Sequence, residues 1–81
     1  MKLQIAKVDY YALLGIYYAI SVRKRDIESL TADAARILGV KSETDYGDAY
    51  YGLVTDAVYE DWTVKELLGK LKIKIKDQPT L

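Results

Sequence analysis

Residues 10–22 are the longest apolar segment of the chain, and they constrain its fold more than any other feature. Leucine, alanine and tyrosine dominate residues 8–22 and no proline interrupts them, which predicts a helix. One side of this helix is small and flat, with Val8, Ala12, Gly15, Ala19 and Val22; the other is bulky, with Tyr10, Leu13, Leu14, Tyr17 and Ile20. A helix that is apolar nearly all round is buried on more than one side. Because 81 residues offer few elements to cover it, we expect a central helix and a homodimer.

Two further helices are predicted in the middle of the chain. Asp26 can cap a helix that ends at Gly39, with Val40 as the hydrophobic residue after the glycine. Thr44 can cap a third helix, whose apolar positions recur through residues 46–57 at helical spacing.

The sequence from Trp62 to Leu67 gives the sharpest local signal. Thr63 and Glu66 have the spacing of a capping box, and Trp62 and Leu67 occupy the positions of a hydrophobic staple. A short fourth helix should therefore begin at this point and end at Gly69.

Both ends of the domain show the alternation of a strand. Residues 2–6 alternate weakly, and residues 70–76 alternate lysine with leucine or isoleucine throughout. The two strands should pair with each other or across a dimer. We therefore predict an α+β fold, mainly helical, with the order β-α-α-α-α-β in one domain over residues 1–76 and a flexible tail at 77–81.

The residue types exclude most catalytic chemistry. Cysteine and histidine are both absent, which removes disulfides, thiolate and imidazole metal ligands, and the commonest nucleophiles and general bases. The acid pairs Asp45/Asp48 and Asp56/Glu60 have no companion motif, so we predict no metal, no cofactor and no enzyme. The apolar segment is shorter than the about 20 residues of a membrane span, which favours a cytoplasmic protein.

Charge is unevenly distributed although the whole chain is neutral. Residues 26–66 hold ten acids against three bases, a net −7, whereas residues 1–25 and 67–81 are net +4 and +3. The acidic middle is also rich in tyrosine, a residue enriched at protein interfaces. The leading hypothesis is a non-catalytic interaction module, an adaptor or inhibitor with the size and style of phage and mobile-element proteins, whose acidic, tyrosine-rich surface would suit a basic protein partner. Its candidate partner-binding residues are Asp45, Asp48, Tyr51, Asp56, Tyr59 and Trp62.

The alternative hypothesis is a small DNA-binding regulator. Residues 34–44, with Ala35 four positions before Gly39, resemble the helix-turn-helix pattern of such regulators, and the whole motif would span residues 31–54. The second helix departs from that pattern, because Asp45 and Asp48 stand where the family has aliphatic residues. Nucleic-acid contacts would come from Lys41, Ser42, Lys70, Lys72, Lys74 and Lys76. The four C-terminal lysines would otherwise form the solvated face of a strand.

Overall fold

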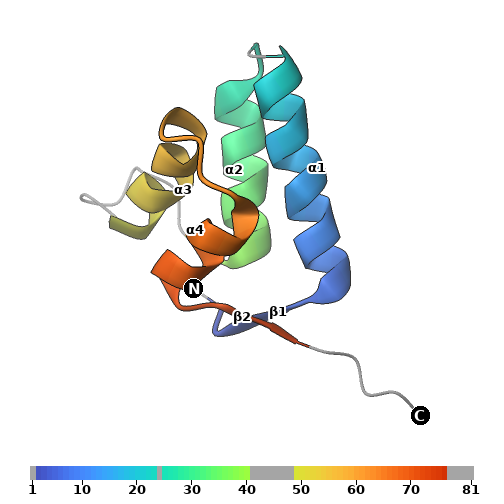
Figure 1. Cartoon of the computed structure of the whole chain (residues 1–81), viewed down its shortest axis with the longest axis vertical. Helices are drawn as coiled ribbons and strands as arrows, with labels where there is room; N and C mark the ends of the chain where they lie inside the picture. The colour runs from blue at the N-terminus through green and yellow to red at the C-terminus, as the bar shows by residue number, and fades with distance from the viewer. Residues whose placement is uncertain (1, 24, 41–48, 77–81) are drawn as a thin grey trace.

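A computed structural model describes residues 2–23, 25–40 and 49–76. In chain order, its elements are β1 (Gln4–Ala6), α1 (Lys7–Arg23), α2 (Ile27–Leu38), α3 (Ala49–Tyr59), α4 (Val64–Leu71) and β2 (Lys74–Lys76). Within this described part, four helices are flanked by two short strands, which confirms the predicted α+β architecture (Figure 1).

The hydrophobic core lies where all four described helices meet. Helices α1 and α2 pack side by side, and α3 and α4 cover one side of this pair (Figure 1). The largest fully buried side chains are Leu13, Leu38, Val54, Leu67 and Leu71. Each helix supplies at least one of them, so the core depends on all of the helices together.

The predicted end of α2 and the predicted start of α4 are confirmed, but the predicted end of α4 at Gly69 is wrong, because the helix continues to Leu71. Gly39 adopts a left-handed conformation (φ 72°), and the Val40 amide donates a 2.8 Å hydrogen bond to the Ala35 carbonyl, as in a Schellman cap. At the start of α4, the Glu66 amide donates to Thr63 Oγ1 at 3.1 Å, and the Thr63 amide donates to Glu66 Oε1 at 3.3 Å. This reciprocal pair is the predicted capping box.

Asp26 differs from the expectation for a helix cap. It occupies the N-cap position of α2, but its side chain makes no capping hydrogen bond. One of its carboxylate oxygens instead lies 3.9 Å from Nη1 of Arg23. The guanidinium of Arg23, at the end of α1, therefore pairs with the carboxylate of Asp26, which was expected to cap α2.

The predicted strand over residues 70–76 is wrong in its first half. Helix α4 continues to Leu71, Lys72 ends it in the left-handed conformation, and the strand is confined to Lys74–Lys76. Leu71 satisfies two patterns, because it alternates with Ile73 and also lies four residues after Leu67. Burial on the helical face determines the outcome, since Leu67, Leu68 and Leu71 are all buried in the core.

The two strands pair with each other in parallel, within one chain. Ile5 lies opposite Ile75, and Gln4 lies opposite Lys74. The chain between them passes through all of the described helices, which supplies the long crossover that a parallel pair requires. The pair closes one end of the helical core, through the buried Ile5 and Ile73.

Helix α1 is buried on one side only, which contradicts the expectation that it is central and covered on several sides. Leu13 and Ile20 are its buried residues, and Tyr10, Ile16 and Tyr17 pack partly against the core. Its other side forms an edge of the molecule (Figure 1). Leu14, expected on the bulky side, is 40% exposed because it lies at the margin of this outer side.

Candidate functional site

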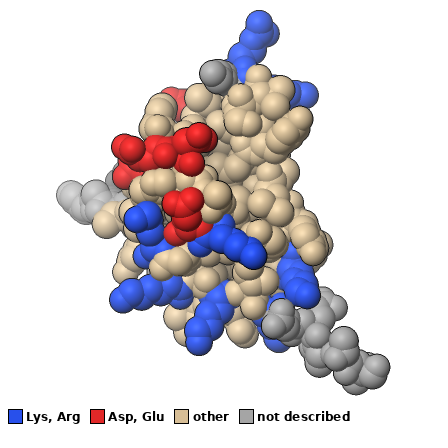
Figure 2. All heavy atoms as spheres, in the orientation of Figure 1, with Lys and Arg blue, Asp and Glu red and all other residues tan. Residues whose placement is uncertain are grey.

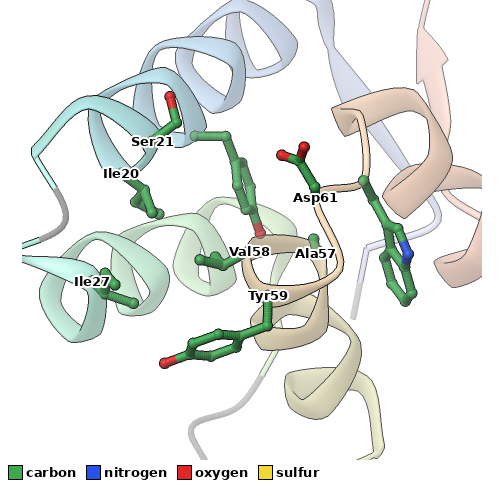
Figure 3. Close-up of a pocket in the computed structure, with 9 residues that line it drawn as sticks. Ile20, Ser21, Ile27, Ala57, Val58, Tyr59 and Asp61 are labelled. Carbon is green, nitrogen blue, oxygen red and sulfur yellow. The ribbon is translucent and has the colours of Figure 1, made fainter.

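A pocket of about 540 Å³ lies between the second half of α1, the start of α2 and the end of α3. Its aliphatic lining comes from Ile20, Ile27, Ala57 and Val58, and Figure 3 shows these side chains converging from the three helices. Tyr17, Ser21, Tyr59, Asp61 and Trp62 complete the lining.

The turn after α3 positions the polar and aromatic groups at this pocket. Asp61 is left-handed (φ 57°), and the Trp62 amide donates a 3.0 Å hydrogen bond to the Ala57 carbonyl. This is a Schellman-type ending in which an aspartate takes the place usual for glycine. The sharp reversal brings Asp61 back beside the last turn of α3, where Tyr59 is exposed (Figure 3).

Tyr17 forms a fixed wall of the pocket. Its hydroxyl donates a 2.9 Å hydrogen bond to the Val54 carbonyl and so ties α1 to α3. Burial, with a smaller contribution from the neighbouring Tyr51, raises the pKa of Tyr17 well above its usual range. The phenol is therefore neutral at physiological pH and acts as a structural group.

Trp62 makes a cation–π contact with Lys70 and packs against the core. Nζ of Lys70 lies 4.6 Å from the centroid of the Trp62 ring, within cation–π range. The indole also packs against the buried core, to which Leu67 of the predicted staple belongs. Trp62 is thus a half-buried residue with a defined position, not a loose surface aromatic.

The surroundings of the pocket are acidic on the α3 side. Asp56, Glu60 and Asp61 are all exposed at the end of α3 and in the turn after it. Figure 2 shows acidic side chains gathered in the upper left of the molecule, above an area rich in lysine and arginine. On the face shown in Figure 2, acidic and basic side chains thus gather in adjacent areas.

The structure brings together only part of the predicted partner-binding set. Tyr59 and Trp62 line the pocket, and Asp56 is exposed one helical turn before Glu60. Tyr51 is half-buried and packs against the core instead of presenting an exposed ring. Asp45 and Asp48 lie outside the described residues.

Sequence reasoning missed the pocket residues supplied by the first two helices. Tyr17 and Ile20 were assigned to the bulky side of α1, but nothing in the sequence indicates that this side meets the end of α3. Ser21 also lines the pocket, and its hydroxyl donates a 2.8 Å hydrogen bond to the Tyr18 carbonyl.

The aliphatic lining of the pocket and the acidic residues beside it suit binding of an apolar group that carries a neighbouring positive charge.

The predicted nucleic-acid-binding residues do not share one strand face. Lys70 belongs to α4 and contacts Trp62, Lys72 is the cap, and only Lys74 and Lys76 lie on β2. Lys41 and Ser42 lie outside the described residues, as does the rest of the helix-turn-helix pattern over 41–48.

Residues 2–23, 25–40 and 49–76 contain no group of three or more aspartates or glutamates that could hold a metal ion. In the same part of the chain, no helix combines the length and apolar character needed to cross a membrane.

Comparison with protein-family models, curated proteins and solved structures finds no match to this chain.

Proposed function

We propose that this chain is a non-catalytic protein-interaction module that binds a basic segment of another protein. The observation that supports the proposal is the pocket itself, whose lining combines aliphatic residues with the aromatic residues Tyr59 and Trp62 and the acidic residue Asp61. A pocket with apolar walls and few polar groups is the usual form of a recognition site.

The lining defines the chemistry of the bound segment. A large aliphatic or aromatic side chain can bury its surface against Ile20, Ile27 and Val58, which contributes about 1.5–3 kcal/mol for a fully buried side chain. An adjacent arginine or lysine can then pair with Asp61. The exposed Asp56 and Glu60 add attraction for a cationic segment and favour its rate of association.

Tryptophan fluorescence provides a direct test. Trp62 is the only tryptophan of the chain and lines the pocket, so its emission reports on occupancy. The probes are two synthetic peptides that share a central pair of leucines, flanked by arginines in one and by glutamates in the other. We expect the arginine peptide to shift the emission in a saturable manner and the glutamate peptide to leave it unchanged.

Matched variants locate the binding. Asp61→Asn removes the charge and suits the left-handed backbone, because asparagine tolerates that conformation. It should weaken binding of the arginine peptide several-fold, and Tyr59→Ala should do the same. Asp9→Asn is the control, because it makes the same charge change in the first turn of α1, away from the pocket. Equal binding of both peptides, or equal loss in Asp61→Asn and Asp9→Asn, would refute the proposal.

A second candidate function, nucleic-acid binding, is favoured by a separate observation. Exposed lysines gather around the two strands and α4, namely Lys2, Lys7, Lys65, Lys70, Lys72, Lys74 and Lys76. Figure 2 shows several basic side chains over the lower half of the molecule. Phosphate contacts made by such lysines give an affinity that falls steeply with salt.

Fluorescence anisotropy with a random-sequence DNA duplex tests this second candidate. Binding at low salt that weakens steeply at moderate salt, and that is lost in the double variant Lys74→Gln/Lys76→Gln, would support it. Arg36→Gln, which removes an exposed charge from α2, is the control. Absence of binding at low salt would exclude this candidate and leave the peptide pocket unaffected.

A further inference from the structure

The outer side of α1 is an uninterrupted apolar face. The exposed residues Val8, Tyr11, Ala12, Leu14, Gly15, Tyr18 and Val22 define this outer face. Val8, Tyr18 and Val22 are 68%, 70% and 62% exposed. Between Lys7 and Arg23 the outer face contains no charged residue, and in Figure 2 the surface over α1 is neutral between basic side chains. Single exposed apolar residues are ordinary, but a contiguous face of this kind marks an interaction surface.

The spacing on the outer face is that of a helix-pairing seam. Val8, Tyr11, Gly15, Tyr18 and Val22 follow intervals of three, four, three and four residues. This is the heptad repeat with which one helix packs along another. Val8 and Val22 each lie seven positions from Gly15, so an antiparallel copy of α1 centred on Gly15 would place Val8 against Val22. The same pairing would place the large Tyr11 against the small Ala19, and the large Tyr18 against the small Ala12.

Gly15 has no use within the single chain. A Cβ atom built at this position meets no other atom within 4 Å, so close packing inside the chain does not require glycine. Glycine in the middle of a helix destabilises it relative to alanine. A glycine at the centre of a seam allows two helix backbones to approach closely, which gives this residue a role in a pair of chains.

The charges at the two ends of the outer face favour one orientation. Antiparallel pairing brings Lys7 of one copy beside the Arg23–Asp26 ion pair of the other, in which the carboxylate offsets the charge of the guanidinium. Parallel pairing would bring Lys7 beside Lys7. Antiparallel pairing also sets the positive pole of each helix dipole against the negative pole of the other. The face is about 25 Å long, because α1 has 17 residues, which corresponds to a small interface and a dimer of moderate affinity.

We propose that the outer face of α1 is the interface of a symmetric homodimer, in which two α1 helices pack antiparallel with Gly15 at the two-fold axis. A two-fold interface uses the same patch on both copies, and a seam whose tyrosines would each face an alanine of the other copy is complementary to itself. None of the outer-face residues lines the pocket between α1, α2 and α3. The dimer therefore carries two open pockets, and this inference does not depend on what they bind.

Mass measurement of the whole chain tests the interface. Sedimentation velocity of the wild type should give a mass twice the 9.2 kDa of one chain at high micromolar concentration. Gly15→Glu should give the single-chain mass with an unchanged helical circular dichroism spectrum, because Gly15 is exposed and a Cβ atom at this position meets no neighbouring atom within 4 Å. Gly52→Glu is the matched control, since Gly52 in α3 has equally open surroundings. It should remain dimeric.

Cysteine cross-linking tests the orientation, and the chain is suited to it because it contains no cysteine. With antiparallel pairing, Val8→Cys alone and Val22→Cys alone should form little disulfide dimer under mild oxidation, whereas a mixture of the two should form it readily. A disulfide dimer from Val8→Cys alone would overturn the antiparallel arrangement. A single-chain mass for the wild type at every concentration, or a dimeric Gly15→Glu, would overturn the interface itself.

Discussion

The Tyr17 hydroxyl donates a 2.9 Å hydrogen bond to the carbonyl oxygen of Val54, across 37 positions of the sequence. This bond joins α1 to α3 at one wall of the pocket, where the phenol is partly buried. It therefore connects the stability of the helical core to the shape of the candidate site.

Replacing Tyr17 with phenylalanine should lower the free energy of unfolding by about 1 kcal/mol at neutral pH, because one buried hydrogen bond is lost. Urea denaturation followed by circular dichroism measures the change. Tyr18→Phe, on the exposed side of the same helix, is the control and should change little. An equal loss in both variants would show that the Tyr17–Val54 bond has no special contribution.

The same residue predicts a loss of stability in alkali. Burial raises the pKa of Tyr17 in the folded chain above the value near 10 of an unfolded tyrosine. Between those two pKa values the unfolded chain has released the proton and the folded chain has not, so the free energy of unfolding falls as pH rises above 10. The slope approaches about 1.4 kcal/mol per pH unit for one such group. The advantage of the wild type over Tyr17→Phe should thus vanish about one pH unit above 10.

Urea denaturation of both proteins at several pH values between 8 and 11 measures this difference. Subtracting the Tyr17→Phe curve removes the contributions of the other tyrosines and of the lysines. Parallel curves for the two proteins would contradict the assignment of a raised pKa to Tyr17.

Thr31 offers a stabilising substitution. It lies in α2 at 3% exposure, and its hydroxyl has no hydrogen-bond partner among the described residues. Burying an unpaired hydroxyl costs free energy, and valine has nearly the same shape without it. Thr31→Val should therefore raise the free energy of unfolding by about 1 kcal/mol. A decrease in thermal midpoint would mean that the hydroxyl has a partner.

Thr63 should respond in the opposite direction to the same substitution. Its hydroxyl accepts the Glu66 amide in the capping box of α4. Thr63→Val removes this acceptor and should lower the free energy of unfolding by about 1 kcal/mol. Thermal melts of the two variants side by side test both predictions, because the substitution is identical and only the hydrogen bonding differs.

The sequence predicts local features of this fold well because their causes are local. Gly39 with Val40, and Thr63 with Glu66, act within a few residues of the chain, and both predicted motifs are present in the structure. The order of helices and strands follows from hydrophobic periods of similar range.

The candidate site could not be predicted in this way, because it depends on contacts between distant segments. Its walls come from residues as far apart as Ile20 and Trp62. Periodicity shows that one side of α1 is bulky, but it does not show which helix covers that side. The same limit explains why the sequence wrongly predicted that α1 is covered on several sides within the chain. An apolar face on a helix does not reveal whether this chain or another one covers it.

The last prediction concerns Lys72, at the boundary between α4 and β2. At this position the helical pattern of α4 competes with the alternating pattern of a strand. This residue is left-handed (φ 59°), and its Cβ destabilises that conformation, which glycine adopts without cost. Lys72→Gly should raise the free energy of unfolding by about 0.5–1 kcal/mol, whereas Lys72→Ala removes the same charge and keeps the strain. The converse change, Gly39→Ala, should lower stability by about 1 kcal/mol because Gly39 has the same backbone geometry. Urea denaturation of the three variants measures these differences. If Lys72→Gly and Lys72→Ala were equally stable, helix α4 would not end at a left-handed Lys72, and the longer strand predicted from residues 70–76 would regain support.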